Sequence, residues 1–96
     1  MPVSLTPRER AHLKARAHAL EPLVHVGQGG LTDGVLREVE RALTAHGLIK
    51  VRAGGEDRVA RAELLEAICA RTDAAPVQHV GKVFVLWRPQ PEEPGA

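Results

Sequence analysis

The hydrophobic residues of this chain follow two spacings that alternate along its length. In three segments they recur every three or four positions, which is the spacing of an amphipathic helix. Between and after these segments lie short apolar or alternating runs, which are typical of strands. The predicted helices span residues 7–19, 33–46 and 58–72, and the predicted strands span residues 23–26, 48–53, 77–80 and 83–87.

Capping residues mark where two of these helices begin and where one of them ends. Thr6 suits the N-cap of the first helix, Pro7 suits its first position, and Glu9 completes a capping box. Thr32 suits the N-cap of the second helix. Gly47 stands where a glycine commonly ends a helix. These residues predict the helix boundaries independently of the hydrophobic spacing.

The order of the elements predicts one mixed sheet. Two successive strand–helix–strand units imply parallel strands joined by right-handed crossovers. The dipeptide Gly81-Lys82 between two apolar runs predicts a two-residue hairpin, so the last two strands are expected to be antiparallel. Alternation in the strand over 48–53 turns Lys50 and Arg52 outward. The predicted fold class is α/β, a two-layer α+β sandwich of order α-β-α-β-α-β-β with a four-stranded mixed sheet.

The composition is that of one small domain. Ninety-six residues with 44% hydrophobic content are enough to bury a single core. We therefore expect one domain over residues 1–89, followed by a disordered tail over 90–96, where prolines and glutamates gather. The one cysteine excludes an intramolecular disulfide and fits a reducing compartment. With no signal-peptide or membrane-spanning pattern, we expect a cytoplasmic monomer.

Charge is nearly balanced overall but unevenly distributed. The net charge of +1 does not by itself indicate a nucleic-acid partner, and one Phe, one Trp and no Tyr argue against RNA readers built on stacking aromatics. The predicted first helix, however, is basic over most of its surface, with Glu9 as its acid. Ten arginines against three lysines suit phosphate binding. A compositional bias toward Arg and Ala would produce the same counts.

Three glycines within four positions separate the first strand from the second helix. Gly27, Gly29 and Gly30 let the backbone turn sharply and leave its N–H groups open to a ligand. The helix beginning beyond them adds partial positive charge, so the pattern predicts an anion site suited to phosphate. Together with Gln28, these residues have the G-x-x-G spacing with which KH domains clamp a nucleic-acid backbone. The alternative is a glycine-rich connection that binds nothing.

Enzymatic chemistry finds no support in the sequence. No lysine follows the glycines as in a Walker loop, and Thr32 replaces the third glycine of the dinucleotide fingerprint. The histidines lack metal-ligand spacing, and Cys69 falls on the apolar side of a helix, where a buried, unreactive thiol is expected. We therefore expect no enzyme, no metal, no cofactor and no small-molecule substrate. The helix acids are expected to be solvated: Glu38, Glu40, Glu63 and Glu66.

Four segments occur in an order and at separations that resemble a known family. They are the run Leu13 to His18 with Leu20 and Pro22, the run Val26 to Thr32, the run Leu48 to Val51, and Gly81-Lys82 followed by Val85 to Arg88. Over residues 5–89 the chain resembles the CRM domain family (chloroplast RNA splicing and ribosome maturation) in its stand-alone bacterial YhbY-like form. Three residues depart from the family's usual pattern: Gln28 adds no charge to the loop, Gly47 replaces an acid, and Trp87 replaces a tyrosine.

The resemblance implies both a topology and a function. The fold would be similar to the C-terminal domain of translation initiation factor three, with two helices against one face of a mixed sheet. The strand order would be 1-2-4-3, and only the last strand would run antiparallel. The resemblance also implies RNA binding and association with precursors of the large ribosomal subunit. The loop over 27–30 would be the family's G-x-x-G contact.

Two hypotheses of function follow. The first is a non-catalytic RNA-binding protein that binds ribosomal RNA and assists large (50S) subunit assembly. The second is a protein-interaction module that docks on a ribosomal or assembly protein. Neither involves a membrane. The candidate RNA-binding residues are the loop residues Gly27, Gln28, Gly29 and Gly30 and the cations Lys14, Arg16, Lys50, Arg52 and Lys82.

Overall fold

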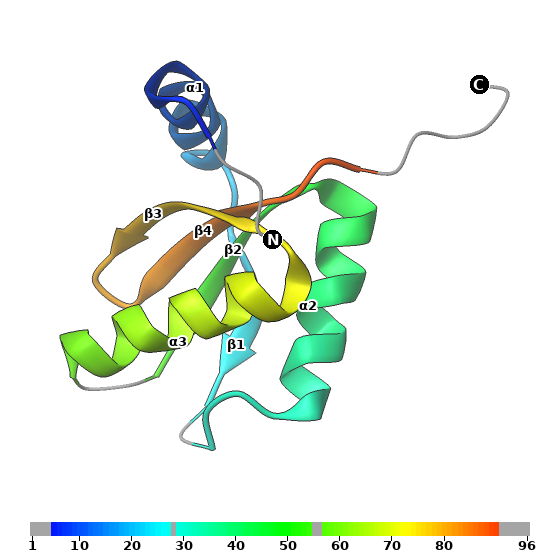
Figure 1. Ribbon diagram of the computed structural model, residues 1–96, viewed down its shortest axis with the longest axis vertical. Coiled ribbons are helices and arrows are strands. Elements are labelled where there is room, and N and C mark those ends of the chain that lie inside the picture. Colours follow the sequence, from blue (N-terminus) through cyan, green and yellow to red (C-terminus); the bar gives the residue numbers. More distant parts are fainter. Residues whose placement is uncertain (1–4, 28, 55–56, 91–96) are drawn as a thin grey trace, which may run out of the picture.

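Three helices and a four-stranded sheet make up the protein (Figure 1). The computed structural model describes residues 5–27, 29–54 and 57–90. The sheet order is β1-β2-β4-β3, which confirms the predicted α/β class and topology. The elements are α1 (Pro7–Ala17), β1 (Pro22–Val26), α2 (Asp33–His46), β2 (Leu48–Ala53), α3 (Arg58–Thr72), β3 (Ala75–Val80) and β4 (Val83–Trp87).

The strand pairing agrees with the expected hairpin and crossovers. β1 and β2 are parallel, and β4 runs antiparallel to both of its neighbours. Gly81 has φ 55° at the first central position of the β3–β4 turn, a conformation that glycine adopts without steric cost. In the register of β2 and β4, Lys50 lies opposite Val85 and Arg52 lies opposite Val83. Both cations therefore lie on the sheet face that carries these two valines.

The two faces of the sheet are covered unequally. α2 and α3 pack on one face over the larger core, which includes the fully buried Ile49, Val51 and Phe84. α1 packs on the other face over a smaller cluster with Val77 and Val85. Figure 1 shows α1 at one end of the molecule and the β1–α2 loop at the other end, with the sheet between them. A single short helix thus covers only part of the second face.

Some boundaries differ from the sequence prediction. α1 ends at Ala17 rather than at residue 19, and Leu20 beyond it is 37% exposed. β1 begins one residue early, at Pro22. β3 begins at Ala75 rather than at residue 77, because Ala75 pairs with Trp87 in the antiparallel ladder. The first residues of β1 and β3 depend on pairing with neighbouring strands, and hydrophobic spacing within one segment does not reveal this pairing.

The predicted helix caps are present. The Thr6 hydroxyl accepts from the Glu9 N–H at 3.1 Å, and the Glu9 carboxylate accepts from the Thr6 N–H at 2.9 Å. The hydrogen bond from the Thr6 N–H to the carboxylate, and to a lesser extent the Thr6 side chain, lower the pKa of Glu9. The Thr32 hydroxyl accepts from the Val35 N–H at 3.2 Å at the start of α2. These contacts explain why α1 and α2 begin where the sequence places them.

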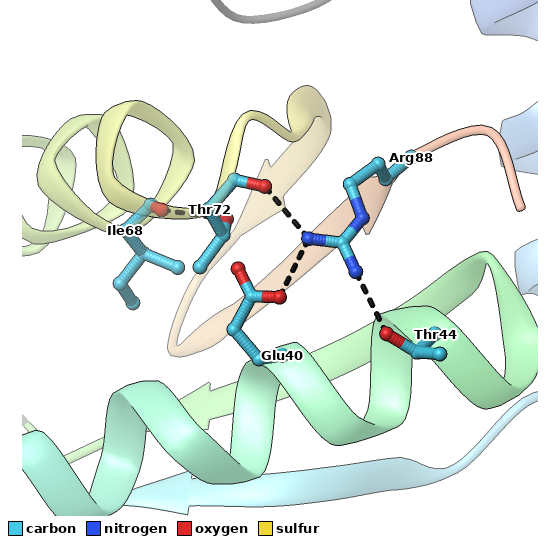
Figure 2. Close-up of polar contacts among 5 residues, drawn as sticks. All are labelled: Glu40, Thr44, Ile68, Thr72 and Arg88. Atoms are coloured by element: carbon cyan, nitrogen blue, oxygen red, sulfur yellow. Dashed lines mark hydrogen bonds and ion pairs between the residues drawn. The ribbon is translucent and has the colours of Figure 1, made fainter. Parts of the chain in front are cut away.

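Arg88 joins the end of β4 to both helices of the larger core (Figure 2). Its Nη1 donates to Glu40 Oε2 at 2.8 Å and to the Thr72 carbonyl at 2.9 Å, and its Nη2 donates to Thr44 Oγ1 at 3.0 Å. The Arg88 side chain is 18% exposed and that of Glu40 is 47% exposed. The expectation that Glu40 is a solvated helix acid is therefore wrong, since it holds a cation 48 residues away in sequence.

Two residues after β4, Arg88 and Gln90, attach the chain to the end of α2. The Arg88 N–H donates to the Gly47 carbonyl at 2.9 Å, and Gln90 Nε2 donates to the Ala45 carbonyl at 2.8 Å. A Cβ at Gly47 would lie 3.3 Å from the Arg88 carbonyl oxygen, so a side chain there would crowd this attachment. Gln90, expected in the disordered tail, is thus held at the end of α2. The remainder of that expected tail, 91–96, lies outside the described residues.

No helix within the described part of the chain is long and apolar enough to cross a membrane.

Replacing Arg88 by Met should lower the free energy of unfolding by about 2 kcal/mol, because it removes three hydrogen bonds made by a partly buried cation. Arg41→Met is the matched control, since Arg41 lies on α2 and is exposed. Urea titrations of both variants measure the difference. Equal midpoints for the two variants would show that the Arg88 contacts add nothing to stability.

Candidate nucleic-acid interface

The loop after β1 exposes its backbone. The Gly30 N–H donates to the Gly27 carbonyl at 3.0 Å, which closes a tight turn. A Cβ built at Gly27 or Gly30 would meet no atom within 4 Å, and one at Gly29 would meet only the Thr32 methyl group at 4.0 Å. Gly30 has φ 73°, a left-handed backbone conformation that favours glycine. Gly27 and Gly29 are exposed, and Gly30 is half-buried. Gln28 lies outside the described residues.

α2 begins directly beyond this glycine loop (residues 27–30). Its first-turn N–H groups are the unpaired donors of a helix start, and the Thr32 hydroxyl takes up that of Val35. The macrodipole adds partial positive charge at this end, although Asp33 in the first turn offsets part of it. The exposed glycine backbone and the helix start together can accept one phosphate group.

Two of the predicted cations lie at the end of the sheet that carries the glycine loop, Arg52 on β2 and Lys82 in the β3–β4 turn. Arg52 pairs with His25, two residues before the loop, and both side chains are exposed. The Ala53 N–H donates to the Lys82 carbonyl at 2.7 Å, and the Gly54 N–H donates to the Val26 carbonyl at 2.9 Å. These bonds draw the end of β2 toward both the glycine loop and the β3–β4 hairpin.

The opposite flank of the glycine loop is less suited to an anion. A hollow of about 800 Å³ separates the loop from α3, and its lining includes the carboxylates of Asp57 and Glu63 together with Arg61. Carboxylates repel phosphate, whereas Arg52 and Lys82 attract it. We therefore expect a phosphate chain to leave the loop along the strands and not along α3.

A second cationic site lies where α1 meets the sheet. Lys14 and His18 of α1 face Lys50 of β2 across a cleft of about 340 Å³, which we call the α1 cleft. Lys50 Nζ donates to the Leu20 carbonyl at 2.9 Å, which holds its ammonium group beside the end of α1. No carboxylate is among the described residues that line the cleft. They are Lys14, Ala17, His18, Lys50, Gln78, Val80, Val83 and Val85.

Arg16 is not part of this cleft. It lines a separate hollow with His46 and Leu23, on the other flank of α1. Helical geometry explains the separation, because residues two positions apart point to nearly opposite sides of a helix. The five predicted cations therefore do not gather around the glycine loop. We call the other four the band of cations: Arg52 and Lys50 share one face of β2, Lys14 lines the α1 cleft with Lys50, and the turn that carries Lys82 is bonded to the end of β2.

Sequence reasoning missed the wall of the α1 cleft formed by β3 and β4. Gln78 and Val80 come from β3, and Val83 and Val85 come from β4. Alternation within β4 indicates that Val83 and Val85 share a face, but no local signal indicates that α1 would lie over them. That placement depends on contacts between segments more than 60 residues apart.

The described residues also bear on metal binding and on thiol chemistry. Among the described residues, no group of three or more His, Cys, Asp or Glu side chains could hold a metal ion. Cys69 is buried in the larger core, as expected for a structural thiol. Burial raises the pKa of its thiol from 9.0 to about 12.

Comparison with known proteins identifies the family of this chain. The sequence model of the CRS1/YhbY (CRM) domain matches residues 5–88. The chain belongs to the CRS1/YhbY (CRM) family. It is 45% identical over 89 residues to an RNA-binding protein of Haemophilus influenzae, covering 93% of this chain and 90% of that protein.

Other CRM relatives carry similar names. A Pseudomonas aeruginosa protein named as a probable RNA-binding protein is 39% identical over 90 residues, covering 94% of this chain and 86% of that protein. A solved structure of a candidate RNA-binding protein from Staphylococcus aureus superposes with a TM-score of 0.84 at 27% identity, covering 93% of each chain. The CRM topology is thus shared with a solved structure over almost the whole chain.

Cys69 should react very slowly with a disulfide reagent such as DTNB while the protein is folded. A pKa near 12 instead of 9.0 lowers the thiolate fraction at pH 8 by about a thousandfold, and burial blocks access as well. Because the pKa of Cys69 is higher in the folded state than in the unfolded state, burial of the neutral thiol contributes to the free energy of unfolding. This contribution is complete below pH 9 and is lost as the pH rises from 9 toward about 12. Labelling in native and in denaturing buffer measures the contrast, and equal rates would contradict the burial.

Proposed function

We propose that this protein is a non-catalytic RNA-binding protein of the cytoplasm that binds ribosomal RNA in precursors of the large (50S) ribosomal subunit and assists their assembly. The observation that supports this most is the glycine loop at one end of the band of cations, where Gly27 and Gly29 are exposed and a Cβ at Gly27 or Gly30 would meet no atom within 4 Å. Membership of the CRM family and the names of the relatives support RNA as the ligand.

The proposed binding mode starts at the glycine loop. One phosphate of the RNA contacts the loop backbone and the start of α2, where N–H groups donate to its oxygens. The RNA strand then passes Arg52 and Lys82, whose exposed side chains neutralise the next phosphates. Lys50 and Lys14 continue the band at the α1 cleft. Phosphate contacts of this kind position RNA and provide most of the salt-dependent affinity.

Docking on a ribosomal or assembly protein is the second candidate function. The hollow on the other flank of α1 supports it, because Leu20 and Leu23 are 37% and 54% exposed there. Exposed leucines of this kind are common at protein contacts. Glu21 and Arg16 line the same hollow, so it lacks the uniform positive charge of the α1 cleft.

Gly29→Asp should weaken binding to structured ribosomal RNA by about tenfold or more, and adding Gln28→Asp should weaken it further, because carboxylates then face the phosphate. The fold should survive, since a Cβ at Gly29 meets only an ordinary contact. Gly29→Asn is the matched control, with a side chain of the same shape and no charge. Filter-binding titrations with transcribed large-subunit RNA fragments measure the affinities.

Unchanged affinity of Gly29→Asp would refute the role of the glycine loop. If the wild-type protein bound no RNA but was retained on a purified ribosomal protein, docking would replace RNA binding as the function.

Lys14→Gln should weaken RNA binding more than Arg16→Gln, although each variant removes one exposed cation from α1. Lys14 faces the band of cations across the α1 cleft, whereas Arg16 lies on the other flank. Lys14→Gln should lower the slope of log affinity against log salt by about 0.7, the value for one phosphate on single-stranded RNA. Its effect should add to that of Gly29→Asp, because the two sites lie far apart. Equal losses for both lysine and arginine variants would show that α1 contributes only general charge.

A further inference from the structure

The α1 cleft has a chemistry that phosphate binding alone does not explain. Its inner wall is apolar, made by Val80, Val83 and Val85 on neighbouring strands. Its rim carries two lysines, Lys14 on one side and Lys50 on the other, with His18 beside Lys14. A surface that only neutralised phosphates would have no need of a recess floored by three valines. The combination indicates a ligand with a charged end and a flat apolar part.

Gln78 adds a polar group beside the valines. It lies opposite Val85 in the β3–β4 ladder, half-buried, and its side chain lines the cleft. A glutamine amide has two donors and one acceptor with two lone pairs, so it can pair with the edge of any nucleobase. The volume of about 340 Å³ is in the range of pockets that hold one small-molecule-sized group.

Lys50 is placed to hold the charged end. Its ammonium group donates to the Leu20 carbonyl at 2.9 Å, which fixes it at the α1 side of the cleft. An ammonium group has three donors, so two stay available to a phosphate. Because the described lining contains no carboxylate, an anion meets no repulsion there.

We propose that the α1 cleft binds one unpaired nucleotide of the RNA, with its base against Val80, Val83 and Val85, its edge on the Gln78 amide, and its phosphate on Lys14 and Lys50. This inference rests on the proposed RNA-binding function and narrows it. The preferred RNA then carries an extruded or single-stranded base within reach of the band of cations.

A continuous duplex does not satisfy this cleft. Bases inside an A-form helix are stacked, and their edges lie in grooves that a recess between a helix and a sheet cannot enter. Proteins that bind a base in a pocket act on single strands or turn the nucleotide out of the stack. The specificity of this site therefore depends on the absence of pairing at one position.

The test compares two oligomers that differ only in their bases. One is a mixed-sequence RNA of about 12 nucleotides, and the other is a chain of equal length built of abasic 1′-deoxyribose units, which keep the 2′-hydroxyl groups and the phosphates. If the cleft takes a base, the wild-type protein should bind the first about tenfold more tightly than the second. Fluorescence anisotropy at low salt gives both affinities.

Variants locate the base contact. Gln78→Leu removes the amide and should reduce the tenfold ratio to about threefold. Val80→Asp places a carboxylate on the floor and should reduce it to about one. Val80 is 59% exposed, so the fold should tolerate the change, and Gln78→Leu carries the test if it does not. Val59→Asp is the matched control: Val59 is 63% exposed on α3, across the sheet from α1, and the ratio should stay at the wild-type value.

Each outcome has one meaning. A wild-type ratio of one, with both oligomers bound, would overturn the nucleotide site and leave RNA binding intact. The tenfold ratio retained in both Gln78→Leu and Val80→Asp would place the base elsewhere and overturn the assignment to this cleft. Binding of structured ribosomal RNA without binding of either oligomer would overturn it as well. Failure to bind either oligomer or structured RNA would instead overturn the proposed function itself.

Discussion

The sheet has two faces to cover, and the chain supplies three helices for them. α2 and α3 both pack on one face, so among the described helices the other face has the 11 residues of α1. Over the uncovered part of that face, apolar residues would remain in contact with water, which is unfavourable. β2 accordingly places Lys50 and Arg52 there while Ile49 and Val51 face the core. The cationic surface is thus a consequence of how the helices are shared between the two faces.

The larger core also determines the path of the chain directly after β4. Arg88 follows the last residue of β4 and contacts α2 and α3 at the same time, so it holds the two helices in a fixed relation to the sheet. Because residue 47 is a glycine, the segment after β4 can pass close to the end of α2. This fixed packing matters for the proposed interface because α2 begins at the glycine loop. A loop that binds phosphate through its backbone needs a rigid helix behind it.

The proposed binding of RNA along the band of cations, and not at a single pocket, fits the modest net charge of the protein. A net charge of +1 provides little long-range attraction. Local separation of charge compensates, because the carboxylates Asp57 and Glu63 line the α3 side of the glycine loop while Arg52 lies on the strand side. A phosphate chain is therefore directed along one side of the loop. In this arrangement, the recess under α1 adds selection for an unpaired base to the attraction of phosphate.

The sequence by itself determined the local structure of this protein. Thr6, Thr32 and Gly81 act within a few residues of themselves, through caps and a turn, so their effect can be predicted without knowing the fold. The same holds for alternation in β2. The exposed backbone at Gly27 and Gly29 also follows from the sequence, because a glycine has no side chain of its own.

Only the tertiary structure decided which distant residues meet. Nothing near Glu40 in sequence predicts its bond to Arg88, and nothing near Lys14 predicts that it faces Lys50 and Gln78 while Arg16 faces away. The family resemblance implied the strand order, but it did not place α1 at the end of the molecule opposite the glycine loop. Such contacts depend on how whole elements pack, and packing is set by the summed burial of many residues rather than by any short segment.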